Sequence, residues 1–275
     1  MSLNLTIFIA VFVVAVALFV WSCIGRFRLI FLGRHENRFR DVGKRVRGVL
    51  YYAFVQRCTV SHGYRFGLNH LVLFWCFTIL LVANTEFLLH GLFPDYVRFS
   101  RLPNGAYYTL SYIFDVVSIL ALIAVCVAIV RRLAFAPSYI EARTRDAFTI
   151  LLLVALLMIA FFGLHASEIA RGNETAAKYM PISNFVASNA FSGLSTGSLS
   201  SYINAFWWLH AVVLLSFLNY LPYSKHMHIL TSIPNLFFRS LSKVNTQPRE
   251  KFEGGKEFGV GRIDQFSWKG LFDSY

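Results

Sequence analysis

The sequence has little cysteine, and its cysteines are not spaced for a metal cluster. The four residues, Cys23, Cys58, Cys76 and Cys126, include no CxxC pair, and three of them lie in or beside apolar blocks. Neither a disulfide framework nor a cysteine-ligated zinc or iron–sulfur site is therefore predicted within this chain. We interpret the cysteines as small buried hydrophobic groups.

Acidic residues are also few, and no internal repeat or low-complexity tract is present. Asp and Glu number 14 against 26 Lys and Arg, which gives a formal charge of +12. In a soluble protein this charge would make nucleic acid the first partner to consider. However, 56% of the residues are apolar and 17% are aromatic, with 28 Phe, which is too apolar for an ordinary soluble domain. We therefore expect membrane lipid as the surrounding solvent.

The basic residues alternate between loops. Ten of the 26 lie between Arg26 and Arg65, four between Arg131 and Arg145, and eight from Lys225 onward. This is the positive-inside pattern, which places the N-terminus outside and the C-terminus in the cytoplasm and makes nucleic acid an unexpected partner. The two remaining loops hold only Arg98, Arg101, Arg171 and Lys178.

Apolar blocks of membrane-spanning length predict an all-α integral membrane bundle of about five transmembrane helices. The first block lacks the basic start and the small-residue cleavage site of a secretory signal, so we expect it to be retained as a helix. The polar stretch 171–202 is predicted to form an outer loop. The five predicted spans are about Leu3–Trp21, Phe66–Leu92, Tyr107–Val130, Ala147–Ile169 and Ile203–Leu221.

The presence of histidines within these spans requires an explanation, because burying ionisable side chains in a membrane costs free energy. His70, His90, His165 and His210 lie in the blocks, and neutral imidazole is a common ligand of haem iron. A lone histidine in an apolar helix is otherwise a hydrogen-bonded packing residue. The spacing of the histidines decides between these interpretations.

The spacing of His210 and His228 favours ligation. They are 18 residues apart, which at about 100° per residue returns to the same helix face and separates them by roughly 27 Å, if the helix continues past Pro222. His70 lies near the cytoplasmic end of the second span, so an inner bis-histidine haem from His70 and His228 is predicted. His226 lies about 160° around from His210 and is the weaker alternative.

Spacing does not single out a second haem ligand to pair with His210 near the outer side of the membrane. His90 is 20 residues from His70, a rotation of about 200° that turns it to the opposite face. His165 has a suitable depth and follows Gly163, which leaves room for a bulky ring. We favour His165, with His90 as the alternative.

Three acidic residues within or at the ends of spans are candidates for a quinone site, because quinone chemistry also moves protons. They are Asp115, Glu168 and Glu86. Asp115 is the deepest, and a pair with an Arg, His or Tyr side chain explains it equally well. Glu168 is one turn from His165, where it would support the imidazole or accept a quinol proton, although solvation at a helix end also explains it.

The run Trp208-Leu209-His210, followed by Leu221-Pro222-Tyr223-Ser224-Lys225-His226-Met227-His228, resembles the last helix of the respiratory nitrate reductase gamma subunit. That family is a five-helix dihaem b cytochrome, and the resemblance implies haem ligands at His210, His228 and His70. The family's other ligand on the second helix falls where this sequence has Leu80. Either another helix supplies that ligand or only the inner haem is bound, so two haems b are expected and one is possible.

The chain is also similar to membrane proteins in which such a cytochrome is fused to a heterodisulfide-reductase-like iron–sulfur domain, including electron-transfer-flavoprotein:quinone oxidoreductases. In these, a segment similar to Phe258–Trp268 leads into the first cluster-binding cysteines, which this sequence does not reach by Tyr275. We expect that this chain is a piece of a longer protein or that its iron–sulfur module is a separate subunit. The resemblance implies a multi-pass protein of a prokaryotic inner (cytoplasmic) membrane.

Together these features predict a membrane cytochrome b domain over residues 1–230 and a cytoplasmic tail over 231–275 that leads to or docks an iron–sulfur module. The expected function is electron relay between the quinone pool and that cytoplasmic iron–sulfur partner, with an electron-transfer flavoprotein as a possible upstream partner. The chain would be the electron-transfer subunit or domain of a quinone oxidoreductase.

The aromatic residues Phe258, Phe266 and Trp268 suit a packed interface between the tail and that module. A helix lying in the membrane interface, as residues 237–239 suggest, explains such residues as well. The rival function is a proton-coupled transporter or channel subunit without haem, in which histidines and carboxylates form a proton relay.

Overall fold

The structure is a computed structural model that describes residues 3–61, 64–135, 143–242 and 261–274, without the side chains of residues 58 and 64–66. No β-strand occurs in these ranges, and five helices are long and apolar enough to cross a membrane. The predicted all-α membrane bundle is thus confirmed. The five helices are α1 (Leu3–Phe27), α4 (Tyr64–Leu92), α5 (Asn104–Ala134), α6 (Arg145–Arg171) and α8 (Thr196–Tyr220).

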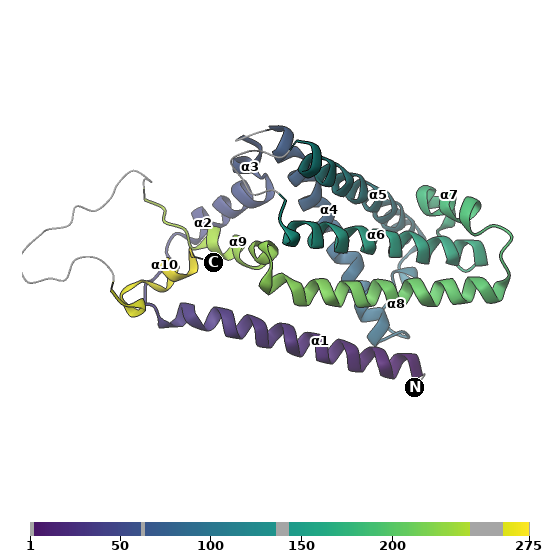
Figure 1. The fold of residues 1–275 in the computed structure, drawn as a ribbon, viewed down its shortest axis with the longest axis horizontal. Helices are drawn as coiled ribbons and strands as arrows, with labels where there is room; N and C mark the ends of the chain where they lie inside the picture. The colour runs from purple at the N-terminus through teal and green to yellow at the C-terminus, as the bar shows by residue number, and fades with distance from the viewer. Residues whose placement is uncertain (1–2, 62–63, 136–142, 243–260, 275) are drawn as a thin grey trace, which may run out of the picture.

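The long helices run side by side, with α6 packed along α8 and α5, and α5 packed along α4 (Figure 1). Helix α1 contacts α8 and α4, and only 11% of its apolar window is buried. Its main anchor is Phe8, which is 1% exposed and lies 5.0 Å from the Trp207 ring. Gly91 allows this close packing, because a Cβ atom there would lie 2.5 Å from the Phe8 ring.

Local signals set both ends of α6 and the start of α8. The Thr144 side chain accepts a hydrogen bond from the Ala147 N–H and starts α6, and Ser195 caps α8 through Ser198 in the same way. Helix α6 ends at Gly172, whose φ of 81° is in the left-handed region that glycine tolerates. These caps place the start of α8 seven residues earlier than the hydropathy predicts.

The stretch 171–202, predicted as a loop, contains an additional helix, α7 (Pro181–Ala190). Pro181 occupies its first turn, where a missing N–H costs nothing. A short 3₁₀ turn at Ala177–Tyr179 precedes it. Helix α7 packs on α6 and α5, so this end of the bundle, here called the α7 end, is covered by ordered structure.

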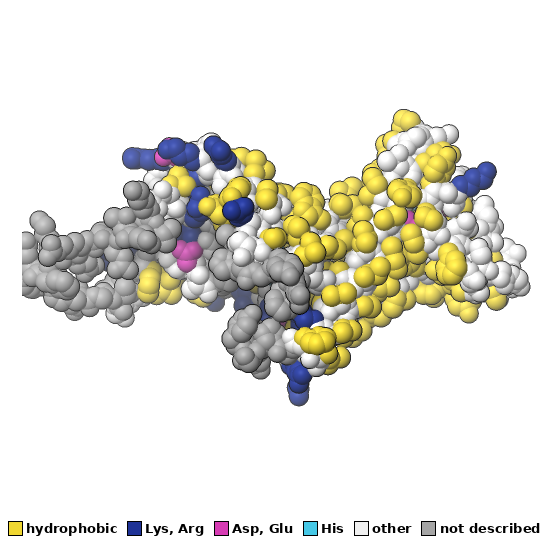
Figure 2. All heavy atoms as spheres, turned by 90° about the horizontal axis from the view of Figure 1, so that it is seen from above, with side chains coloured by type: hydrophobic (Ala, Val, Ile, Leu, Met, Phe, Trp, Pro, Cys, Tyr) yellow, Lys and Arg dark blue, Asp and Glu magenta, His cyan; other side chains and the backbone are white. Residues whose placement is uncertain are grey.

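The opposite end carries short helices formed by the basic segments, and we call it the basic end. Figure 2 shows Lys and Arg side chains gathered at the ends of an apolar body, mostly at this one. The buried guanidinium of Arg45 donates to the carbonyl oxygens of Phe237 and Arg239 at 2.8 and 2.9 Å and so caps the end of α9. The short helices are α2 (Val42–Val49), α3 (Arg57–Ser61), α9 (His228–Phe237) and α10 (Trp268–Phe272).

The prediction from the spacing of His210 and His228 required the last long helix to continue past Pro222. In the structure the helix does not continue. Helix α8 ends at Tyr220, two 3₁₀ turns follow at Leu221–Tyr223 and Lys225–Met227, and α9 begins at His228. Proline removes a backbone donor and its ring clashes with the preceding turn, which ends the helix here. The position of His228 is therefore set by these turns and not by the periodicity of one helix.

The tail folds back on the first basic segment. Trp268 donates from its indole nitrogen to the Glu36 carbonyl oxygen at 2.7 Å, and its ring lies 5.0 Å from that of Phe238. Trp268, predicted to face a partner, thus packs within this chain, whereas Phe266 is 42% exposed. Phe258 lies outside the described residues. Further turns, one π-helical at Leu50–Phe54 and the others 3₁₀, lie at Arg28–Leu32, Phe99–Arg101 and Ile263–Gln265.

Candidate functional site

The structure brings His70 and His228 together at the basic end. Their ring centres are 6.4 Å apart, with 37° between the ring planes. His70 lies in the first turns of α4, and His228 is the first residue of α9. Both residues are exposed on the surface of the bundle.

This pair fits bis-histidine ligation of one iron. A metal–nitrogen bond of about 2 Å puts each ring centre roughly 3 Å from the metal, so two opposed ligands have centres roughly 6–6.5 Å apart. The Nδ1 of His228 lies 2.9 Å from the carbonyl oxygen of Lys225. When Nδ1–H donates to this oxygen, Nε2 carries the lone pair that a metal needs.

Several hydrogen bonds hold the segment that presents His228. Asp146 accepts one from the Tyr220 hydroxyl at 2.6 Å and one from the Lys225 backbone N–H at 2.9 Å. The Ser224 hydroxyl accepts from the His226 N–H at 3.1 Å. The first turn of α6 therefore fixes the chain on both sides of the break at Pro222.

His226 lies beside the pair, with its ring centre 5.4 Å from that of His228 at an interplanar angle of 60°. Burial, and then the neighbouring His228, lower the pKa of His226 to about 4, so its ring is neutral near neutral pH. A ring across from His70 suits ligation better than a ring beside His228. The choice of His228 over His226 as the ligand stays a prediction.

His210 lies toward the α7 end and is buried, at 4% exposure. Its Nε2 lies 2.9 Å from the amide oxygen of Asn84 on α4, and its ring packs 4.5 Å from Phe87. Its Nδ1 has no hydrogen-bond partner among the described residues. His210 thus faces α4 one turn beyond Leu80, where the resemblance had placed the missing ligand.

The two candidate partners of His210 have other contacts. His165 Nδ1 lies 3.7 Å from Glu174 Oε2, and His90 Nε2 accepts a hydrogen bond from Arg98 at 2.6 Å. The space beside Gly163 is filled by Phe206, since a Cβ atom there would lie 2.4 Å from that ring. An outer pair of haem ligands stays a prediction.

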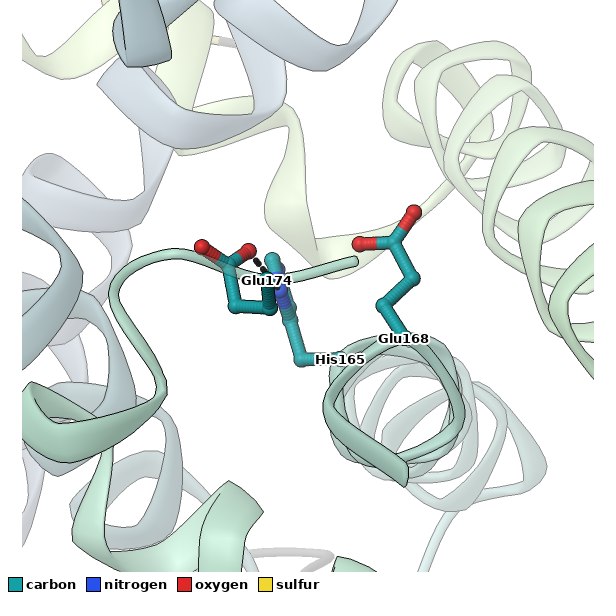
Figure 3. Close-up of side chains that lie close together, drawn as sticks. All are labelled: His165, Glu168 and Glu174. Atoms are coloured by element: carbon teal, nitrogen blue, oxygen red, sulfur yellow. Dashed lines mark ion pairs between the residues drawn. The ribbon is translucent and has the colours of Figure 1, made fainter. Parts of the chain in front are cut away.

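His165, Glu168 and Glu174 form a compact cluster at the α7 end (Figure 3). One ligand atom from each lies within 4.8 Å of the others. The Tyr107 hydroxyl donates to Glu174 Oε1 at 2.5 Å, and the Ala176 N–H donates to the same oxygen at 2.9 Å. Burial raises the pKa of Glu174, but the contacts from His165, Tyr107 and Ala176 outweigh it and bring the pKa below that of an ordinary carboxyl group.

The other acidic candidates are engaged by the backbone. Asp115 is fully buried and accepts hydrogen bonds from the Ile182 N–H at 2.7 Å and from the N–H and hydroxyl of Ser183 at 3.1 and 2.6 Å. It therefore caps the start of α7 from another helix. Glu86 accepts a hydrogen bond from the Phe99 N–H at 3.0 Å.

Two bacterial proteins are similar to this chain. One is the EtfAB:quinone oxidoreductase of Syntrophomonas wolfei, 24% identical over 273 residues that cover 96% of this chain and 37% of that protein. The other is the probable iron–sulfur-binding oxidoreductase FadF of Bacillus subtilis, 27% identical over 280 residues, 99% of this chain and 38% of that protein. The chain thus spans less than two fifths of the length of either relative. No family model and no solved structure matches it.

Sequence reasoning missed several residues that hold these sites. Glu174 lies in the turn after α6, where no helical periodicity applies, and Asp146 resembles an ordinary residue of a first helical turn. Tyr107 gave no signal beyond being aromatic. Asn84 did carry a signal in the sequence, because it is a polar residue in an apolar span one turn from Leu80.

Proposed function

We propose that this chain is a membrane-bound b-type cytochrome that relays electrons between a membrane quinone pool and an iron–sulfur partner. The observation that carries the proposal is the proximity of His70 and His228, with 6.4 Å between ring centres. The names of the two relatives, which refer to oxidoreduction, a quinone and iron–sulfur binding, support it. The rest of each relative lies outside the region similar to this chain.

The chain's own residues would bind and orient the cofactor. His70 and His228 would ligate the iron, and the Lys225 carbonyl oxygen would keep the His228 ring in the tautomer whose Nε2 is free. A bound haem b supplies reversible one-electron transfer, and the protein tunes its potential through ligand orientation and burial. Asp146 and Ser224 keep that orientation by holding the turns before His228.

For quinone chemistry, Glu168 is the acidic candidate that the geometry favours. Within the described part of the chain its carboxylate makes neither a hydrogen bond nor an ion pair, whereas Asp115 caps α7 and Glu86 binds the Phe99 N–H. A carboxylate without a fixed partner is free to accept a proton. We propose Glu168 as the proton acceptor of a quinol site at the α7 end, beside His165.

We propose that the iron–sulfur partner docks at the basic end, where the two histidines of the proposed inner site lie. The tail segment with α10 packs on residues 34–36 at this end. In a bacterial inner membrane, the positive-inside rule puts this end in the cytoplasm. Electrons would then pass between the cytoplasmic partner and the haem held by α4 and α9.

The first test is the reduced-minus-oxidised visible spectrum of the purified chain, with haem per chain from a pyridine haemochrome assay. His70→Ala and His228→Ala are each expected to lose the same haem while the protein still inserts, because either change would remove one of its two proposed ligands. His35→Ala in the basic loop is the matched control and keeps the wild-type spectrum.

The haem count decides the extent of the relay. One haem per chain, lost in His228→Ala, supports the proposal with electron transfer confined to the basic end. Two haems would extend it across the membrane and would require His210 to exchange Asn84 for iron. Full haem content in His228→Ala contradicts the inner site, and no haem at all favours the haem-free transporter.

A further inference from the structure

The cluster at the α7 end has the composition and spacing of a transition-metal site. It combines an imidazole nitrogen with two carboxylates, His165, Glu174 and Glu168, whose ligand atoms lie within 4.8 Å of one another (Figure 3). Imidazole together with carboxylate suits zinc, whereas calcium and magnesium prefer oxygen ligands alone. A tetrahedral ion with bonds of about 2 Å brings its ligands roughly 3.3 Å apart, so a small rotation of the side chains completes the site.

The side chain of Glu174 is already organised as a ligand. It is 7% exposed, and its Oε1 receives the Tyr107 hydroxyl and the Ala176 N–H. These donors leave Oε2 facing His165 Nδ1 at 3.7 Å. Hydrogen bonds to the outer oxygen of a ligating carboxylate are the usual support of a metal site.

Apart from His165, which forms an ion pair with Glu174, no basic side chain among the described residues pairs with the carboxylates of the cluster. Among the described residues, no Lys or Arg forms an ion pair with Glu168 or Glu174. Arg98 is within electrostatic range of Glu168, but it donates to His90. The buried Nδ1 of His165 makes no hydrogen bond within the described part of the chain, and the nearest charged atom to it is Glu174 Oε2 at 3.7 Å.

An ion can reach the cluster from the aqueous side. Glu168 is partly exposed near the end of α6, and the next three residues after Ala170, Arg171 to Asn173, are exposed. The fourth position of a tetrahedral ion is then left to water. We propose that His165, Glu168 and Glu174 bind one zinc ion at the α7 end, with Tyr107 holding Glu174 in place. Binding requires neither haem nor quinone, and a zinc ion bound to Glu168 would exclude this carboxylate from accepting a quinol proton.

The test is isothermal titration of zinc into the full chain in nanodiscs after treatment with EDTA. We expect one saturable zinc ion per chain, unaffected by excess calcium. Glu174→Gln and Glu168→Gln are expected to weaken binding on the order of 100-fold, and Tyr107→Phe about 10-fold, because lost ligands cost more than lost supporting hydrogen bonds. His90→Gln, a histidine at the same end but outside the cluster, should bind as the wild type does.

Haem content is measured on the same samples, which separates this site from the proposed cytochrome. Zinc affinity that is unchanged in both Glu168→Gln and Glu174→Gln overturns the proposal, as does the absence of saturable binding in the wild type. A loss of haem in His165→Gln also overturns it, because His165 would then be a haem ligand. Because Glu168 is partly exposed, its variant keeps the test valid if a buried variant fails to fold.

Discussion

At the residue scale, Asp115 shows how one buried carboxylate is stabilised in an apolar bundle. Three donors from the start of α7 converge on its two oxygens, and the positive end of the α7 dipole adds to them. The side chain has no exposed surface. Its role as an anchor for α7 needs no proton transfer.

We expect Asp115→Ala to destabilise the protein by about 3 kcal/mol, because the buried donors of Ile182 and Ser183 lose a charged acceptor. The measurement is denaturant unfolding in detergent together with hydrogen exchange at the amides of residues 182 and 183. Asp95→Ala, an exposed aspartate before α5, is the control. Wild-type exchange at residues 182 and 183 in Asp115→Ala would contradict the anchor.

At the element scale, the break between α8 and α9 is held by the start of α6. Asp146 accepts hydrogen bonds from both sides of the break, through Tyr220 and Lys225. Without it, the turns that carry His226 and His228 lose two of their hydrogen bonds to the bundle. Ligand orientation, and not only overall stability, is then expected to change.

We predict that Asp146→Ala lowers the haem affinity of the inner site about 10-fold, as the loss of a supporting hydrogen bond commonly does. The measurement is haem retained per chain under competition by apomyoglobin, with the g values of the low-spin haem in electron paramagnetic resonance as a report on ring orientation. Asp264→Ala in the tail is the matched control. Unchanged haem retention and unchanged g values in Asp146→Ala would refute this role.

The sequence predicted the long elements better than the short ones. Uninterrupted apolar runs identify α4, α5 and α6 to within a few residues, because crossing a bilayer requires length and little else. Helix α7 was missed because its start depends on Asp115, a residue 67 positions away in the sequence.

The candidate sites were also predicted only in part. The pairing of His70 and His228 was anticipated from the resemblance and from depth, although α8 and α9 are not one helix. The contacts of His210 and His165 with Asn84 and Glu174 were not anticipated, because they join residues from different elements. Whether these residues bind cofactors stays a prediction.

At the scale of the whole molecule, the two ends of the bundle differ in charge and in covering structure. The basic end carries α2, α3, α9 and α10, and the opposite end is covered by α7 (Figure 1). If basic loops are retained in the cytoplasm, each end faces a different aqueous phase. Exposed lysines at both ends make this testable.

We expect Lys178→Cys to react with an impermeant maleimide added to intact cells, and Lys44→Cys to react only after the cells are opened. Both lysines are exposed, at opposite ends of the bundle, so the comparison isolates sidedness. The variants are made in a chain whose native cysteines are replaced by serine. Labelling of Lys44→Cys in intact cells would reverse the proposed orientation.

Arg45 connects α2, at the surface of the protein, to α9, which begins with the proposed haem ligand His228. Arg45 belongs to α2, and the α9 that it holds through the carbonyls of Phe237 and Arg239 begins with His228. If the proposed partner docks on α2, a displacement of Arg45 would move α9, a helix of ten residues that begins with His228. The midpoint potential of the haem would then depend on whether the partner is docked.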